Sequence, residues 1–231
     1  YIGEIKENQP DGRGNFSFKN GKEYTGDVRK GVMHGNGTLT FADKRKFTGS
    51  FKDGKIDGDG VLIWPDGKKY TGQFSESLPD GAGTLAWPDG KIYTGEFNNG
   101  VVEGRGQLSW PSGKKIFGNF KKGLINGQGE MNHDDGRKYI GNFQNGKKHG
   151  KGTFSWPDGR LYMGEFVKDI FQGEGTYIWS NKDRYQGNFI KGMPQGKGKY
   201  IHADGIKFEG IFRDGLPWRG REFDQEGRQI R

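Results

Sequence analysis

Apolar residues and glycines alternate along this chain in a pattern that returns every 23 residues. Tyr70, Gly72 and Phe74 show it: an apolar residue, a glycine two positions later, and a second apolar residue two positions after that. Side chains two apart point to the same face of an extended strand, so each copy predicts a β-strand. The ten copies start at residues 1, 24, 47, 70, 93, 116, 139, 162, 185 and 208.

A second alternation follows in each copy and predicts the partner strand. Residues 81–87 read Gly-x-Gly-x-Leu-x-Trp, again with period two. Residues 64–68 then read Trp-Pro-Asp-Gly-Lys. Proline presets φ at the first turn position and glycine accepts the left-handed conformation, which indicates a type I turn closed by a G1 bulge. Hairpin should therefore follow hairpin as a meander.

Counting back from this turn gives a register. If Trp64 lies opposite Lys68, antiparallel pairing sets residue 62 against 70, residue 60 against 72 and residue 58 against 74. Missing Cβ atoms then leave troughs in which aromatic rings lie, so one face becomes aromatic and shallowly grooved. The opposite face should be wet. It carries Thr71, Gln73, Thr94, Glu96 and Asn119.

The predicted fold is all-β, an elongated single-layer antiparallel meander of ten 23-residue β-hairpin repeats over residues 1–215. Such repeats are stabilised by their neighbours, and end repeats are atypical. In the last copy Arg219 and Arg221 occupy the glycine positions and Gly220 is out of step. We therefore interpret residues 216–231 as a degenerate C-terminal cap or exit segment. The start at Tyr1, inside the motif, leads us to expect a longer native chain.

Composition fits a thin, ordered, glycine-dependent architecture. Only 30% of the 231 residues are hydrophobic and 44 are Gly, which is too little apolar material for an ordinary two-layer core. At 14% aromatic the chain is not typical of disorder. No apolar run approaches the roughly 20 residues needed to cross a bilayer. The absence of cysteine fits a reducing compartment, and we expect an intracellular, cytoplasmic protein associated with the cytoskeleton or with a membrane.

The Tyr-x-Gly-x-Phe strand, a polar loop such as residues 30–37 and the Pro-Asp-Gly turn together resemble the MORN (membrane occupation and recognition nexus) repeat. The resemblance covers essentially the whole chain. It implies an extended antiparallel sheet and a scaffolding or membrane-apposition role. Members of the MORN repeat family include junctophilins, plant phosphoinositide kinases, a lysine methyltransferase, radial-spoke proteins and parasite cytoskeletal proteins. The chain departs from the repeat pattern at Ile116, Lys44, Lys182, His133 and His202.

Nothing in the pattern points to catalysis, a metal or a cofactor. His34 and His149 fall five repeats apart and His133 and His202 three, too far for either pair to hold one ion. Aspartates such as Asp66 and Asp89 recur for turn reasons on an open surface where nothing raises a pKa. Residues 83–91 leave six residues before Gly90-Lys91, where a phosphate loop needs four. We expect a protein that is not an enzyme.

Two surfaces remain as candidates for binding. The aromatic face is first of all the protein's own core, but a single layer leaves part of it uncovered, and exposed apolar patches mark interaction sites. The candidate partner groove comprises Trp64, Tyr70, Trp87, Tyr93, Phe97, Trp110, Tyr139, Phe143 and Trp156. The candidate anionic-surface margin comprises Lys68, Lys69, Lys91, Lys114, Lys115, Arg137, Lys138, Arg160 and Arg184. The alternative interpretation of this margin is a row of charges that only keeps the protein in solution.

Charge is uneven along the chain. Residues 1–115 hold 17 basic and 15 acidic residues, and residues 116–231 hold 20 and 14, so most of the formal net charge of +8 lies in the second half. The first hypothesis is a structural scaffold, cytoskeletal or ciliary, that binds a helix, a peptide or a second copy as a homodimer. The alternative is a membrane-apposition module that binds acidic phospholipids such as phosphoinositides through the basic margin, either alone or as the targeting part of a larger lipid enzyme. Nucleic acid is not expected, because we place the rings in the groove rather than beside the cations.

Overall fold

A computed structural model describes residues 1–230, and every regular element in that range is a β-strand. No helix in this part of the chain is long and apolar enough to span a membrane. The strands are β1 (Ile2–Lys6), β2 (Gln9–Ser17), β3 (Glu23–Arg29), β4 (Val32–Thr40), β5 (Lys46–Lys52), β6 (Lys55–Ile63), β7 (Lys69–Ser75), β8 (Leu78–Ala86), β9 (Ile92–Asn98), β10 (Val101–Ser109), β11 (Lys115–Lys121), β12 (Leu124–Asn132), β13 (Lys138–Gln144), β14 (Lys147–Ser155), β15 (Leu161–Val167), β16 (Ile170–Ile178), β17 (Arg184–Ile190), β18 (Met193–Ile201), β19 (Lys207–Arg213) and β20 (Leu216–Phe223).

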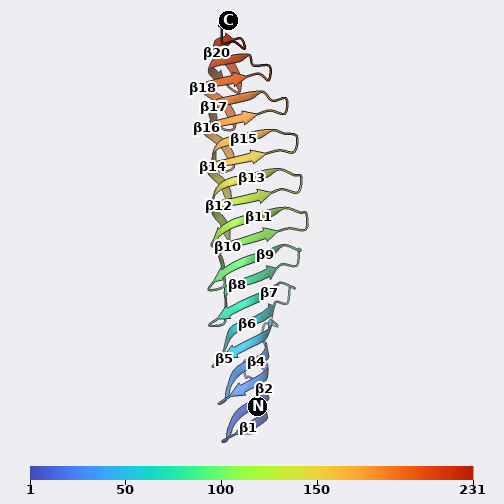
Figure 1. Cartoon of the computed structure of the whole chain (residues 1–231). Helices are drawn as coiled ribbons and strands as arrows, with labels where there is room; N and C mark the ends of the chain where they lie inside the picture. The colour runs from blue at the N-terminus through green and yellow to red at the C-terminus, as the bar shows by residue number, and fades with distance from the viewer. Residues whose placement is uncertain (231) are drawn as a thin grey trace. The chain divides into compact units, whose positions relative to one another are not determined.

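The chain divides into two compact units, one of Tyr1–Pro111 with Phe120–Gly123 and one of Ser112–Asn119 with Leu124–Arg231. Strands β1 to β10 belong to the first and β12 to β20 to the second, and within each unit every strand pairs antiparallel with its successor (Figure 1). The predicted all-β antiparallel meander of hairpin repeats is confirmed. Its elongated shape stays a prediction.

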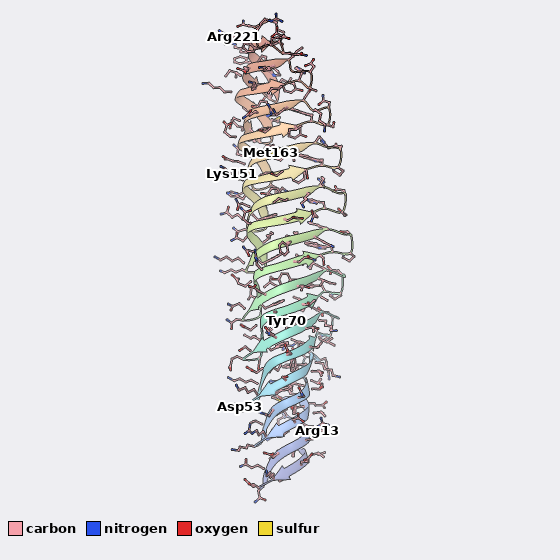
Figure 2. All side chains as sticks on the ribbon, in the orientation of Figure 1. Arg13, Asp53, Tyr70, Lys151, Met163 and Arg221 are labelled. Carbon is pink, nitrogen blue, oxygen red and sulfur yellow. The ribbon has the colours of Figure 1, made fainter. Side chains whose placement is uncertain are left out.

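The predicted register is confirmed. β6 and β7 pair Leu62 with Tyr70, Gly60 with Gly72 and Gly58 with Phe74. Because the large residues and glycines of each strand point to one face, the intervening side chains point to the other. Thr71, Gln73, Thr94, Glu96 and Asn119 are exposed there, as expected. Figure 2 shows another of these polar side chains, Lys151, extending from the ribbon.

A bulge that the sequence pattern did not predict interrupts the register within the hairpins, and a bulge bends the strand locally. Between the pairs Gly72–Gly83 and Phe74–Pro79, one residue of β7 faces three of β8. Gly81, one of those three, has φ +92°, a left-handed conformation that favours glycine. The segment 30–37, expected to be a polar loop, is a two-residue turn followed by the bulged start of β4. We call this two-residue connection the tight turn, and the Trp-Pro-Asp-Gly-Lys connection the wide turn.

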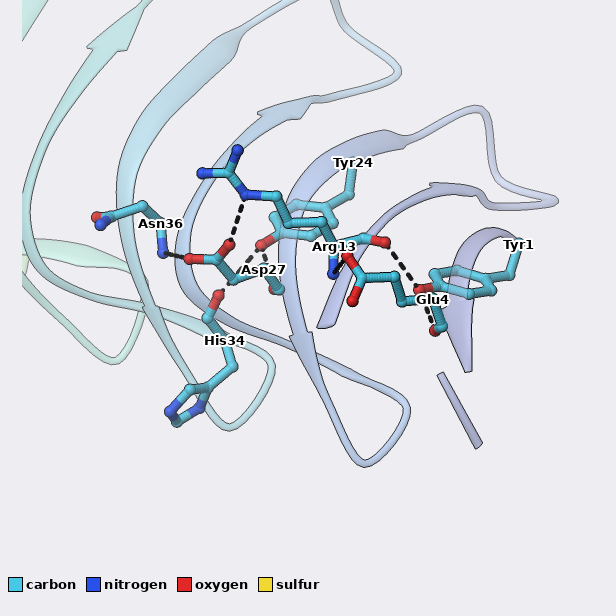
Figure 3. A network of polar contacts seen from close by, with 7 residues as sticks. All are labelled: Tyr1, Glu4, Arg13, Tyr24, Asp27, His34 and Asn36. Atoms are coloured by element: carbon cyan, nitrogen blue, oxygen red, sulfur yellow. Dashed lines mark hydrogen bonds and ion pairs between the residues drawn. The ribbon is translucent and has the colours of Figure 1, made fainter. Parts of the chain in front are cut away.

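Hydrogen bonds from neighbouring side chains satisfy the backbone groups that the bulge leaves unpaired. The hydroxyl of Tyr24 donates to the carbonyl of Asp27 at 2.6 Å. The Asp27 carboxylate accepts the backbone N–H of Asn36 at 2.9 Å and the Nε–H of Arg13 at 3.3 Å (Figure 3). A tyrosine at the first position of the repeat is therefore more than an apolar ring, because its hydroxyl closes the bulge.

Bending closes the aromatic face on itself. The ring of Tyr70 packs edge-on against Phe74 of its own repeat at 5.0 Å and against Phe97 of the next at 4.9 Å. Edge-to-face contacts of this kind are favourable beyond simple burial. Tyr70 has no exposed surface, and Phe74 and Phe97 are 4% and 5% exposed. The expectation of a shallow, partly uncovered aromatic groove is therefore wrong for these rings, because the hairpins fold over them.

The final hairpin omits one residue of the bulge. β20 pairs Phe212 with Pro217 and Gly210 with Gly220, so a glycine that is out of step in the sequence still faces a glycine. The chain then forms another wide turn, in which Asp224 N–H donates to Arg228 O at 2.9 Å. Much of the segment predicted as a degenerate cap thus keeps the hairpin geometry.

Candidate interaction surfaces

Nine rings were predicted to line a partner groove, and the structure separates them into two groups. Tyr70, Tyr93, Phe97, Tyr139 and Phe143 are core residues, each at most 5% exposed. Trp64, Trp87, Trp110 and Trp156 are half-buried and lie in the wide turns. Of these nine rings, the tryptophans alone present surface that another molecule can touch, and they lie at the wide turns.

The wide turn of residues 64–68 holds its tryptophan under a cation. The Trp64 N–H donates to Lys68 O at 2.9 Å and the Gly67 N–H donates to Trp64 O at 3.0 Å, which closes the turn as predicted. The carboxylate of Asp66 accepts the Lys68 N–H at 2.9 Å. This geometry sets the Lys68 ammonium over the indole, 4.2 Å from the ring centroid, a favourable cation–π distance.

The same pairing recurs from turn to turn. Lys91 lies 4.2 Å from the Trp87 ring centroid, and the Arg160 guanidinium lies 5.1 Å from that of Trp156. The prediction that the rings lie apart from the basic margin is therefore wrong. Within each unit, groove tryptophans and margin cations lie together on one surface, which we call the tryptophan–cation margin.

Several cations of this margin already have acidic partners. Arg137 pairs with Asp135 at 2.6 Å, Arg160 with Asp158 at 2.8 Å and Lys138 with Glu130 at 2.8 Å. The backbone N–H and the guanidinium of Arg137 both donate to Asp135 and hold the pKa of that carboxyl below its usual range. Lys69, Lys115 and Arg184 are exposed and make no ion pair within residues 1–230. The margin therefore contains both neutralised and open positive charges.

One wide turn replaces the cation by Asp183, a substitution that sequence reasoning missed. Asp183 is 8% exposed and accepts hydrogen bonds from the Tyr200 hydroxyl at 2.6 Å and the Ala203 N–H at 2.9 Å. His202 Nδ1 lies 3.7 Å from the same carboxylate. The bond from Tyr200 and the other donors hold the pKa of Asp183 below its usual range, despite burial. The missed signal was an acid at a position that is basic in all the preceding repeats.

His133 occupies a tryptophan position, as the sequence indicated. Burial, together with the positive charges of Arg137, Lys114 and Lys148, lowers its pKa. Its Nε2 is buried and has no hydrogen-bond partner. Within residues 1–230 no group of three or more acidic or histidine side chains could hold a metal ion. His133 is thus an uncharged ring at a wide turn.

The polar face carries an open groove that the sequence did not predict. In the second unit it has a volume of about 580 Å³ and a floor of glycine backbone, because the Cα–H of each glycine there replaces a side chain. Ile140 and Thr153 line one side and Lys151 and Glu165 the other. Its mixed, solvated walls offer no convergent set of ligands.

Comparison with protein families gives one match. The MORN repeat family matches residues 1–23, 24–44, 47–69, 70–92, 93–115, 117–136, 139–159, 162–184 and 185–207, nine of the ten copies counted above. No curated protein sequence matches this chain.

Among solved structures, the TCP domain of Drosophila melanogaster SAS-4 (dCPAP), in complex with a proline-rich motif of Ana2 (dSTIL), covers 77% of this chain and 90% of its own length. Its identity is 10% and its TM-score 0.43. The TCP10 domain of Danio rerio CPAP, in complex with a peptide of Danio rerio STIL, covers 95% and 97%, with 16% identity and a TM-score of 0.36. Likeness at this level does not establish a shared function.

Proposed function

This chain belongs to the MORN repeat family, and from that premise we propose that it is a non-enzymatic scaffold whose tryptophan–cation margin binds protein partners. The observation that carries the proposal is the recurrence of half-buried tryptophans under basic side chains, at Trp64, Trp87 and Trp156. Tryptophan and arginine are enriched among residues that dominate binding energy at interfaces. Repetition along the turns supplies several equivalent contacts to one extended partner.

A cytoskeletal or ciliary setting is part of the same proposal. It is supported by the resemblance to a family whose members include radial-spoke and parasite cytoskeletal proteins. The proposal includes binding of a second copy through the same surface, since the margin repeats and would meet itself in a symmetric pair.

The proposal is tested by affinity capture from a cytoskeletal extract with two matched variants. Trp64→Ala with Trp87→Ala removes two margin rings, and Thr71→Ala with Thr94→Ala changes two exposed residues of the opposite face. We expect the tryptophan variant to lose specific partners that the threonine variant retains, by about tenfold or more in recovered protein. Equal recovery by both variants would contradict the proposal. Circular dichroism and melting on the same samples confirm that both variants are folded.

Acidic phospholipid is the second candidate, favoured by the exposed Lys69, Lys115 and Arg184. Each basic residue near a charged surface contributes about 1 kcal/mol, and salt screens that attraction. Changing Lys114, Lys115, Arg137 and Lys138 to Glu should abolish any binding to phosphatidylserine vesicles. We expect wild-type binding to be weak at physiological salt. Tight, salt-resistant vesicle binding would rank this function first.

A further inference from the structure

An apolar patch lies beside two neighbouring tight turns of the second unit. Val167 pairs with Ile170 across the β15–β16 turn, and Ile190 pairs with Met193 across the β17–β18 turn. These residues directly flank the turn and alternate with the buried Phe166 and Phe189, so they point away from the core. In chain order, the four residues are 42%, 49%, 43% and 46% exposed.

This patch is a departure from the repeat. In the other eight copies the residue before the tight turn, where Val167 and Ile190 stand, is Lys, Arg, Ser, Asn or Gln. The hairpin with Ser75 opposite Leu78 is typical, and there a single apolar residue faces a polar one. The two hairpins also lie side by side here, because Cγ2 of Ile170 is 3.9 Å from the position that a Cβ would take at Gly192. Four apolar side chains therefore form one surface.

Open positive charges surround the patch. Lys168 and Lys191 occupy the tips of the two turns and Lys147 lies in the preceding hairpin; all three are exposed and form no ion pair within residues 1–230. The acidic residue at these tips, Asp169, pairs with Lys148 at 3.1 Å and so does not neutralise Lys168 or Lys191. The patch thus has an apolar centre and a positive rim.

The spacing of the patch matches a helix. Equivalent residues of neighbouring repeats are two strands apart, roughly 9.6 Å at about 4.8 Å per strand. Seven residues of an α-helix rise about 10.5 Å. An amphipathic helix with apolar residues in a heptad pattern can therefore lie across the hairpins and meet each apolar pair in turn. A membrane-interface surface would instead be enriched in Trp and Tyr, and the four patch residues are aliphatic or Met.

We propose that Val167, Ile170, Ile190 and Met193 form a docking site for an acidic, heptad-patterned amphipathic helix of a protein partner. The inference rests on the proposed scaffold function and adds a second surface, remote from the tryptophan–cation margin in each hairpin. Apolar contact supplies the affinity, and Lys147, Lys168 and Lys191 select a helix with acidic flanks.

The test uses the whole chain and a labelled synthetic peptide of about 18 residues, with Leu at the a and d heptad positions and Glu and Ala elsewhere. Fluorescence anisotropy should give a dissociation constant on the order of 100 µM or lower. Ile170→Asn with Met193→Asn should weaken binding about tenfold, and Lys168→Glu with Lys191→Glu by a similar factor that shrinks at high salt. Leu78→Asn, an equally exposed tight-turn residue with a polar partner, should leave binding within about twofold of wild type.

Several results would overturn the proposal. These are no binding up to about 1 mM, equal binding of a peptide of scrambled order, or equal loss in the Leu78→Asn variant. Patch-dependent binding to phosphatidylserine vesicles without peptide binding would assign the surface to a membrane. A dimer abolished by Ile170→Asn would assign it to a second copy. Because the margin tryptophans are intact in every variant, failure here leaves the scaffold proposal standing.

Discussion

At the scale of single residues, the tyrosine that opens most repeats performs two tasks. Its ring fills the trough over facing glycines, and its hydroxyl donates to the carbonyl three residues on, as Tyr70 does to Gln73 at 2.9 Å and Tyr139 to Asn142 at 2.8 Å. A phenylalanine performs only the first. Phe47, in the third repeat, fills the same space over Gly60 without this hydrogen bond. Packing therefore sets the shape at this position, and the hydroxyl closes the bulge.

Gly83→Ala should destabilise the protein because the space above Gly83 is occupied. An ideal Cβ there would lie 2.5 Å from Cε2 of Tyr70, while the backbone of Gly83 is one that alanine can adopt. We expect a loss on the order of 1 to 3 kcal/mol, the range for overpacking, in urea unfolding. In a Tyr70→Leu background the added methyl group has room, so the alanine should cost less there. An equal cost in both backgrounds would mean that the ring is not what excludes the methyl group.

Asp183→Asn should remove stability that depends on pH. In the wild type, a carboxylate accepts the Tyr200 hydroxyl and the Ala203 N–H, and these bonds lower its pKa below 3.8. A group with a lowered folded-state pKa stabilises the fold above its unfolded pKa and loses that effect as pH falls. We therefore expect a difference of about 1 to 3 kcal/mol at pH 7 that shrinks below pH 4.

The matched control is Asp66→Asn in an exposed wide turn, which should cost less because water can replace its contact. A gap between wild type and Asp183→Asn that stays constant from pH 7 to pH 3 would show that shape, not charge, matters at Asp183.

At the scale of the hairpin, the sequence predicted strands, wide turns and register, since period-two alternation and Pro-Asp-Gly signal them directly. The bulge could not be predicted from the sequence. It depends on Gly81 adopting a left-handed conformation, and in the sequence that glycine is one more member of a Gly-x-Gly alternation. Without the bulge the aromatic face looks open, which is why core rings such as Tyr93 and Phe97 were predicted to line a groove.

The same hairpin scale explains how the repeat tolerates Ile116 at the tyrosine position. The smaller side chain leaves the space above Gly129 unfilled, and Cδ1 of Ile125 enters it, 2.6 Å from an ideal Cβ. Ile125 is 3% exposed. The sequence marks Ile116 as a departure from the repeat pattern, and the structure shows that the facing strand compensates for it.

The candidate surfaces show the same limit. The sequence located the tryptophans and the cations, because each is fixed relative to the wide turn. It did not show that Trp87 and Lys91 stack, since that follows from the closed turn rather than from the spacing. The patch around Ile170 was also invisible, because only the tight-turn pairing with Val167 makes it continuous.

At the scale of the whole molecule, the buried tyrosines predict loss of stability in alkali. Burial raises the pKa of Tyr24, Tyr70, Tyr93 and Tyr185 to about 12, from 10.0 in an exposed tyrosine. Above pH 10 the unfolded chain releases these protons while the fold retains them, so stability falls as pH rises. Each pKa unit corresponds to about 1.4 kcal/mol per residue.

Phenolate absorbance and far-ultraviolet circular dichroism measure this alkaline transition together. We expect most of the tyrosine absorbance change to coincide with loss of strand signal between pH 10 and 12. A smooth titration centred on pH 10 with the strand signal unchanged would show that these rings are accessible to solvent.

The hydrogen bonds between successive repeats have a consequence for the evolution of the gene. The Gly100 N–H donates to Pro79 O at 2.7 Å, and its counterpart one repeat earlier, Ser77 N–H, donates to Ile56 O at 2.9 Å. Each junction is thus interchangeable with the next. If residues 70–92 were excised, Gly100 would bond to Ile56 as Ser77 does now, and Tyr93 would pair with Leu62 as Tyr70 does now. A gene of this kind can gain or lose 23 codons at a time and still encode a folded protein, so evolution can adjust its reach in fixed increments.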